Sequence, residues 1–169
     1  MKNFNSNNNP TNLQEQLTQL FDRINYRYSI ECDDQERFIL KTNVNMESFV
    51  FDCICVIHKK NRIVHFFYCS PISMSKNKML EIYKFLDHIN GSTYIGSVNL
   101  RHDNREIISK LYFIAEKEII EQELLEFYLF EPVRILNYYM PLILKINYGD
   151  KDALSLICQE QKEVNPADN

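Results

Sequence analysis

Cysteine and histidine side chains gather in one short stretch of the sequence. Cys53, Cys55 and His58 are followed closely by His65 and Cys69. Thiolates and imidazoles are ligands that zinc prefers, so these side chains could hold a metal ion if they converged on one point. Whether they converge depends on the elements that carry them.

Two strand-like runs, residues 47–58 and 62–70, carry these side chains and flank a polar turn at residues 59–61. If the turn closes a β-hairpin, alternation places Cys53 and Cys55 on an apolar core face. His58, His65 and Cys69 then lie on the opposite face. The sequence therefore predicts buried free thiols, with no metal site and no cofactor. Only a β-bulge would bring the two sets together.

No other pattern supplies catalytic groups. Nucleophilic catalysis needs a serine or cysteine beside a base, and a third group that orients the base. The chain has no G-x-S-x-G motif and, with three glycines, no glycine-rich phosphate loop. His88 and His102 fit solvated positions. We predict no catalytic residue and a protein that is not an enzyme. The alternative is an enzyme or small-ligand binder with a pocket between a sheet and the C-terminal helix.

Composition narrows the class of protein. The 169 residues suit one domain, and 45% of them are hydrophobic, which is enough for a packed core. A net charge of −4 argues against nucleic-acid binding, and no apolar run approaches the roughly 20 residues that span a bilayer. The N-terminus lacks an apolar signal core, and the five cysteines suit a reducing compartment. We expect a cytoplasmic protein that binds neither nucleic acid nor membrane.

Hydrophobic periodicity predicts helices and strands in a definite order. Helices are expected at residues 10–25, 75–89, 117–147 and 150–159, the second ending at Gly91 and the last capped by Asp150. Pro132 and Pro141 should split or bend the third helix. Strands are expected at residues 26–32, 37–44, 47–58, 62–70, 93–101 and 105–117. Pro71 should end the fourth strand.

This order predicts an α+β fold, with a twisted antiparallel sheet of about five to six strands flanked by helices. In its last hairpin, Gly96 should face the bulky Leu111. Residues 1–9 are expected to form a disordered tail and residues 10–149 a single domain. Residues 150–169 should form a short C-terminal helix and a loose tail.

Segments of the second half resemble the YbjN-like family of bacterial proteins. The matching segments are residues 86–90, 96–100, 107–112 and 139–141, followed by Ile146, and the resemblance extends over about residues 12–149. It implies an αβββαββα fold like that of secretion chaperones, which are acidic homodimers that bind an extended segment of a client protein. It also implies a regulatory or stress role, but no catalytic residues.

The outer faces of both hairpins are only half polar, so part of this surface should meet another polypeptide. We predict a non-enzymatic protein-interaction module, a chaperone-like or regulatory adaptor that forms a homodimer. The candidate partner or dimer surface comprises Ile54, Val56, Ile63, Phe67, Ile95, Ile108, Tyr112 and Tyr138. A set of acidic residues is read as a solvated helix face, with an acidic patch for a basic client as the alternative. This set comprises Glu116, Glu118, Glu121, Glu123 and Glu126.

Overall fold

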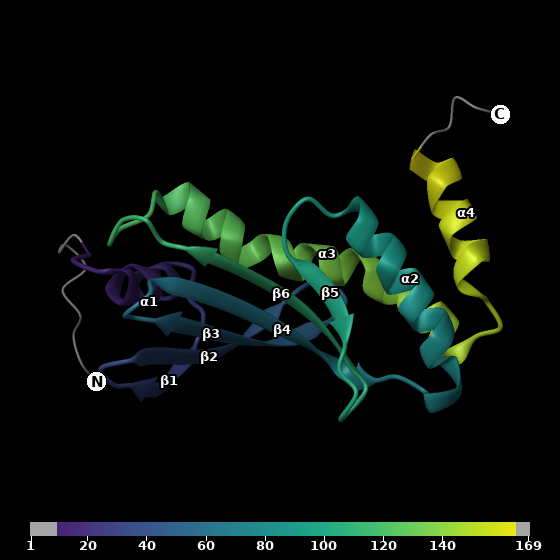
Figure 1. Cartoon of the computed structure of the whole chain (residues 1–169), viewed down its shortest axis with the longest axis horizontal. Coiled ribbons are helices and arrows are strands. Elements are labelled where there is room, and N and C mark those ends of the chain that lie inside the picture. The colour runs from purple at the N-terminus through teal and green to yellow at the C-terminus, as the bar shows by residue number, and fades with distance from the viewer. Residues whose placement is uncertain (1–9, 165–169) are drawn as a thin grey trace.

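A computed structural model describes residues 10–164 and contains one six-stranded sheet and four α-helices (Figure 1). The elements are α1 (Leu13–Arg23), β1 (Tyr28–Asp33), β2 (Arg37–Asn45), β3 (Val50–His58), β4 (Ile63–Ser73), the 3-10 turn η1 (Lys76–Lys78), α2 (Met79–Ser92), β5 (Ser97–Leu100), β6 (Glu106–Ile114), α3 (Gln122–Tyr148) and α4 (Ala153–Val164). The tails expected at residues 1–9 and 165–169 lie outside the described residues.

All neighbouring strands run antiparallel, in the order β1-β2-β3-β4-β6-β5. The α+β class and the strand number predicted from the sequence are confirmed. Four strands precede α2, one more than in the αβββαββα order. The chain leaves β4 through α2, forms the edge strand β5, and returns as β6 between β5 and β4.

Both hairpins have the register that the turn positions predict. Cys53 pairs with Tyr68 in the first, and Ser97 pairs with Lys110 in the second. Gly96 precedes the second pair with a φ of +78°, and a Cβ there would lie 2.8 Å from the Lys110 carbonyl oxygen. The glycine is therefore needed for its backbone conformation and for this close approach. The Leu111 side chain that we expected it to face would be only in ordinary contact, at 3.6 Å.

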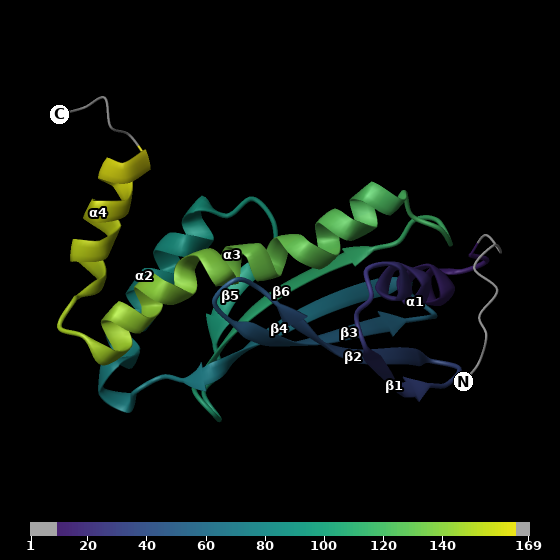
Figure 2. The same cartoon turned by 180° about the vertical axis from the view of Figure 1, so that it is seen from behind.

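Helices cover one face of the sheet. Figure 2 shows α1 and α3 lying in front of it, and Figure 1 shows the opposite face with no helix of the described residues across it. The inward side chains of the central strands are buried, among them Phe66 and Tyr68, both 0% exposed. The Tyr68 hydroxyl donates a hydrogen bond to the Leu129 carbonyl of α3, which ties the helix to the sheet. Beyond the sheet, α4 packs against α2 and buries Ala153 and Leu156.

Several boundary predictions differ from the structure. Gly91 lies inside α2, which continues to Ser92. Pro71 does not end its strand but lies within β4, where the pairing with β6 is irregular between Cys69 and Ser73. A proline at such an irregularity removes no ladder hydrogen bond. Asp152 rather than Asp150 caps α4, because its Oδ1 accepts the backbone N–H of Ser155 at 2.7 Å.

The third helix begins at Gln122 rather than near residue 117, and it is one continuous helix that contains both prolines. This matches the bent-helix alternative, and the helix follows a curved path in Figure 2. It ends at Gly149, where a Cβ would lie 2.5 Å from the Lys145 carbonyl oxygen.

The β5 edge of the sheet is closed by a side chain. Asn90, near the end of α2, accepts the backbone N–H of Val98 at 2.7 Å and donates to the Val98 carbonyl at 2.8 Å. The amide therefore satisfies the outward backbone groups of Val98 much as a neighbouring strand would.

Candidate interaction surface

The helix-free side of the sheet, here called the open face, is built by the alternation of strands β2, β3, β4 and β6. Successive side chains of a strand point to opposite faces, so the residues between the buried positions all point outward. Their burial alternates accordingly in each strand. The open face comprises Arg37, Ile39, Lys41, Asn43, Asp52, Ile54, Val56, His58, Ile63, His65, Phe67, Cys69, Ile108, Lys110, Tyr112 and Ile114.

Strand pairing arranges these side chains in rows across the sheet. One row reads Ile39, Val56, His65 and Tyr112, and the next reads Lys41, Ile54, Phe67 and Lys110. The open face is therefore apolar and aromatic at its centre, with lysines at both ends of the second row. Such a contiguous apolar surface without a covering element is typical of an interaction site.

The end of the open face at β6 is the most exposed. Tyr112 and Ile114 retain 70% and 66% of their accessible surface, whereas the adjacent Leu111, which points to the inner face, is 2% exposed. β6 thus presents large apolar side chains to solvent on one face only.

Aromatic rings pack against one another at the centre of the open face. The His65 ring stacks on Phe67 and on Tyr112, with ring centroids 5.6 Å and 5.7 Å apart, and it meets His58 edge-on at 5.3 Å. Partial burial lowers the pKa of His65, and the nearby His58 lowers it further by charge repulsion. His65 is therefore held in its neutral form over a wider pH range than a free histidine.

A depression of about 510 Å³ adjoins the apolar centre, over β1 to β3. Lys41, Asn43, Asp52 and Ile54 contribute to its lining, and the Asn43 amide donates to the Asp52 carboxylate at 2.6 Å. Lys41 also forms an exposed ion pair with Glu31 at 3.6 Å. These groups could hydrogen-bond a polypeptide lying across the open face. Cys53 also contributes to the lining, but its side chain belongs to the inner face and is 1% exposed.

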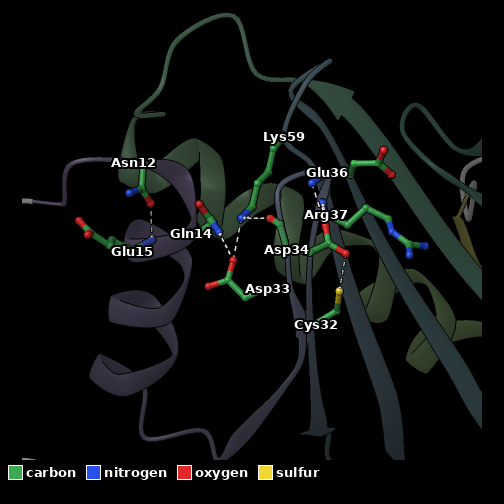
Figure 3. Close-up of polar contacts among 9 residues, drawn as sticks. All are labelled: Asn12, Gln14, Glu15, Cys32, Asp33, Asp34, Glu36, Arg37 and Lys59. Atoms are coloured by element: carbon green, nitrogen blue, oxygen red, sulfur yellow. Dashed lines mark hydrogen bonds and ion pairs between the residues drawn. The ribbon is translucent and has the colours of Figure 1, made fainter.

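A polar network holds the nearby rim of the sheet together (Figure 3). Asp33 Oδ1 accepts from Lys59 at 2.7 Å and from Gln14 of α1 at 3.1 Å, which joins three segments of the chain. Asp34 Oδ1 accepts the backbone N–H groups of Arg37 and Glu36. These N–H groups, the Arg37 one foremost, with the Cys32 thiol, lower the pKa of Asp34 to about 2.

This turn positions Arg37 on the open face. Its side chain extends away from Asp33 and Lys59 in Figure 3, and across the sheet Arg37 pairs with His58. A permanent positive charge therefore lies beside the His58 end of the open face.

Six of the eight predicted surface residues lie together on the open face, namely Ile54, Val56, Ile63, Phe67, Ile108 and Tyr112. The other two do not join them. Ile95 lies in the loop before β5 and packs, partly buried, against the core. Tyr138 is 58% exposed but lies on α3, where its ring meets Tyr139 edge-on.

The candidate surface predicted from the sequence omitted several residues of the open face. Ile39 joins it because β2 pairs with β3, and Ile114 because β6 pairs with β4. Alternation alone could have found Ile114, since it has the same parity as Tyr112. His58 and His65 were placed on this face but were considered only as part of a mixed cysteine–histidine set.

The structure separates that mixed set as the strand argument predicts. Cys53 and Cys55 are 1% and 0% exposed on the inner face, and burial raises the pKa of the Cys53 thiol to about 12. His58, His65 and Cys69 lie on the open face. Across residues 10–160, no group of three or more His, Cys, Asp or Glu side chains is placed to hold a metal ion.

The region between the sheet and α3, the alternative place for a ligand pocket, contains buried side chains of both elements. Phe66, Tyr68, Leu129 and Val133 are each 0% exposed there.

The acidic set predicted as a solvated helix face lies beside α3. Glu116, Glu118 and Glu121 precede this helix in the chain. Within α3, Glu126 forms an ion pair with Arg23 at 2.5 Å and also accepts from Gln122. Glu126 is thus engaged in a contact between α1 and α3.

Comparison with known proteins agrees with the fold. No family model matches the chain, and no curated protein sequence matches it. Among solved structures, it is similar to the crystal structure of YbjN from E. coli, a candidate transcription regulator. That match has a TM-score of 0.53 and 14% sequence identity, and it covers 79% of this chain and 90% of the other. The described residues contain no helix that could cross a membrane. The chain therefore shares the fold of YbjN, which supports the YbjN-like resemblance at the level of fold.

Proposed function

We propose that this protein is a non-enzymatic interaction module that binds another polypeptide through its open face, as a chaperone-like or regulatory adaptor. The observation that carries the proposal is a sheet face that is apolar and aromatic at its centre and that no helix within residues 10–164 crosses. Exposed apolar surface of this kind is unfavourable in water, and a partner that covers it gains binding energy from its burial.

The chemistry of the face indicates what kind of segment it would bind. Ile54 and Phe67 lie side by side between Lys41 and Lys110. A segment with apolar side chains flanked by acidic ones would match this row in both hydrophobicity and charge. Regulation through such contacts fits the description of the E. coli structural neighbour as a candidate regulator.

Photo-crosslinking in the native cell tests this proposal. A photoreactive phenylalanine analogue replaces Tyr112 in one variant and Tyr138 in a second, matched variant. Both tyrosines are exposed, at 70% and 58%, but only Tyr112 lies on the open face. We expect discrete protein adducts from position 112 and far fewer from position 138. Adducts that are absent at position 112, or equally abundant at both positions, would argue against the proposal.

A second copy of the chain is the partner that we expect in the purified protein, which would make it a homodimer. Phe67→Lys places a charge at the centre of the open face, and Tyr138→Lys places the same charge on α3. Light scattering at tens of micromolar should show a dimer for the natural chain and for Tyr138→Lys, but a monomer for Phe67→Lys. A natural chain that is monomeric throughout would rule out the homodimer.

A further inference from the structure

Two histidines lie side by side on the open face. His58 of β3 and His65 of β4 have ring centroids 5.3 Å apart, with an angle of 67° between the ring planes. Neither imidazole bonds to another residue in the part of the chain that the structure describes. The remaining histidines differ, because His88 contacts Glu160 at 3.0 Å and His102 contacts the Tyr83 hydroxyl at 3.2 Å.

The separation of the two rings suits a shared metal ion. Zinc lies about 2.0–2.1 Å from an imidazole nitrogen, so two imidazoles bound at a tetrahedral angle have ring centroids roughly 5 Å apart. The observed 5.3 Å is close to this value. The proposal requires that one nitrogen of each ring turns toward the point between the two rings.

The strands and the neighbouring rings hold the pair in place. β3 and β4 are both paired along two sides, so their backbones are fixed within the sheet. The His65 ring is also stacked against Phe67 of its own strand and against Tyr112 of β6. A site on rigid strands loses little conformational freedom when it binds an ion, which favours binding by few ligands.

We propose that His58 and His65 form a two-histidine site for a divalent transition-metal ion that prefers imidazole, of the class Zn²⁺, Ni²⁺ and Cu²⁺. The class follows from the donors, since imidazole suits these ions and no carboxylate occupies a neighbouring position on the face. Water, or a donor from a bound partner, fills the other coordination positions. The site does not depend on the proposed protein binding, and it can exist without it.

One charged neighbour opposes the ion. Arg37 lies directly across from His58, and its positive charge repels a cation bound there. The other residues beside the two rings are Val56, Ile63, Phe67 and Tyr112, none of which carries a charge at neutral pH. Binding should therefore be reversible, and neutralising Arg37 should strengthen it.

Calorimetric titration of the full chain with Ni²⁺ tests the site directly. We expect one equivalent of Ni²⁺ to bind, and His58→Gln or His65→Gln to weaken binding by about tenfold or more, because each removes half of the protein ligands. His102→Gln removes an exposed histidine elsewhere and should leave the affinity unchanged. The absence of binding, or equal affinity in all four proteins, would overturn the proposal.

Paramagnetic line broadening by Ni²⁺ in NMR spectra locates the ion independently. Signals from Val56, Phe67 and Tyr112 should broaden first, and those near His102 and the exposed Cys158 should not. Arg37→Gln should raise the affinity several-fold while the far-ultraviolet circular dichroism stays unchanged. Broadening centred on Cys158 or His102 would show that the pair is not the site.

Discussion

The two faces of this sheet are built by the same strands, yet one is sealed and the other is open. On the inner face, Leu40, Cys55, Phe66 and Leu111 form a row across four strands, and each is at most 2% exposed. The adjacent residues of the same strands form the corresponding row on the open face, namely Ile39, Val56, His65 and Tyr112.

Strand composition does not explain this difference, since both rows are largely apolar. Helices α1 and α3 lie across only one of the faces, and they decide which row is buried (Figure 2). The apolar character of the open face therefore contributes little to the folding of a single chain. These exposed apolar side chains are suited to binding instead. Experiments on matched residues of the two faces can test whether the faces differ in this way.

The largest expected contrast lies in the reactivity of the thiols. At pH 8, a thiol with the Cys53 pKa of about 12 is ionised in about one molecule in 10⁴. Cys53 is also fully enclosed, whereas Cys69 on the open face is only partly buried. Burial also raises the pKa of Cys69, but less of that side chain is enclosed. Labelling with a maleimide, followed by peptide mass spectrometry, should therefore show Cys53 reacting at least about a hundredfold more slowly than Cys69.

The rate at Cys53 should rise with pH as the thiolate fraction grows, and in denaturant both thiols should react at similar rates. Equal rates in the folded protein would mean that the inner face is not sealed.

Phe66 and Phe67 are adjacent residues of one type that point to opposite faces of β4. Phe66→Ala should lower the free energy of unfolding by about 3–5 kcal/mol, because it leaves a cavity in the core. Phe67→Ala should lower it by less than about 1.5 kcal/mol, because the ring is already in contact with water. Urea unfolding at low protein concentration, where a dimer does not contribute, measures both. Equal losses would contradict the distinction between the faces.

The smallest contrast concerns two tyrosine hydroxyls. Tyr68→Phe removes a buried hydrogen bond to the Leu129 carbonyl and should cost about 1 kcal/mol. Tyr112→Phe removes an exposed hydroxyl and should change stability by less than about 0.5 kcal/mol. Thermal unfolding of the two variants side by side checks this. A loss at Tyr112 as large as that at Tyr68 would indicate that the open face is buried in the protein as purified.

The local parts of the fold could be predicted from the sequence. A short turn fixes the register of a hairpin, so the pairing of Cys53 with Tyr68 and of Ser97 with Lys110 followed from residue numbers. The assignment of Cys53 to the core and of His58 to the other face followed from the same registers. For the candidate surface, alternation alone placed six residues on the outer faces of their two hairpins.

The remaining features depend on contacts between distant segments. No local signal shows that β6 returns beside β4 or that β2 continues the sheet beyond β3, so the rows of the open face could not be assembled. Ile95 was assigned to a strand, but the strand begins at Ser97, and the loop turns this side chain toward the core. The miss at Gly91 is local instead: the glycine looked like a helix stop, but α2 continues to Ser92, and Thr93 Oγ1 donates to the Ile89 carbonyl.

The Asn90 amide that closes the β5 edge also belongs to an Asn-Gly pair, the dipeptide in which asparagine deamidates most readily. The reaction needs the backbone nitrogen of Gly91 to attack the Asn90 side-chain carbonyl, with loss of ammonia. Here Gly91 lies within α2, and the amide is held by both of its bonds to Val98. Deamidation can then proceed only when the last turn of α2 opens. Water then opens the cyclic imide to aspartate or isoaspartate. The rate at which stored protein accumulates these two products at position 90 therefore reports how often that turn opens.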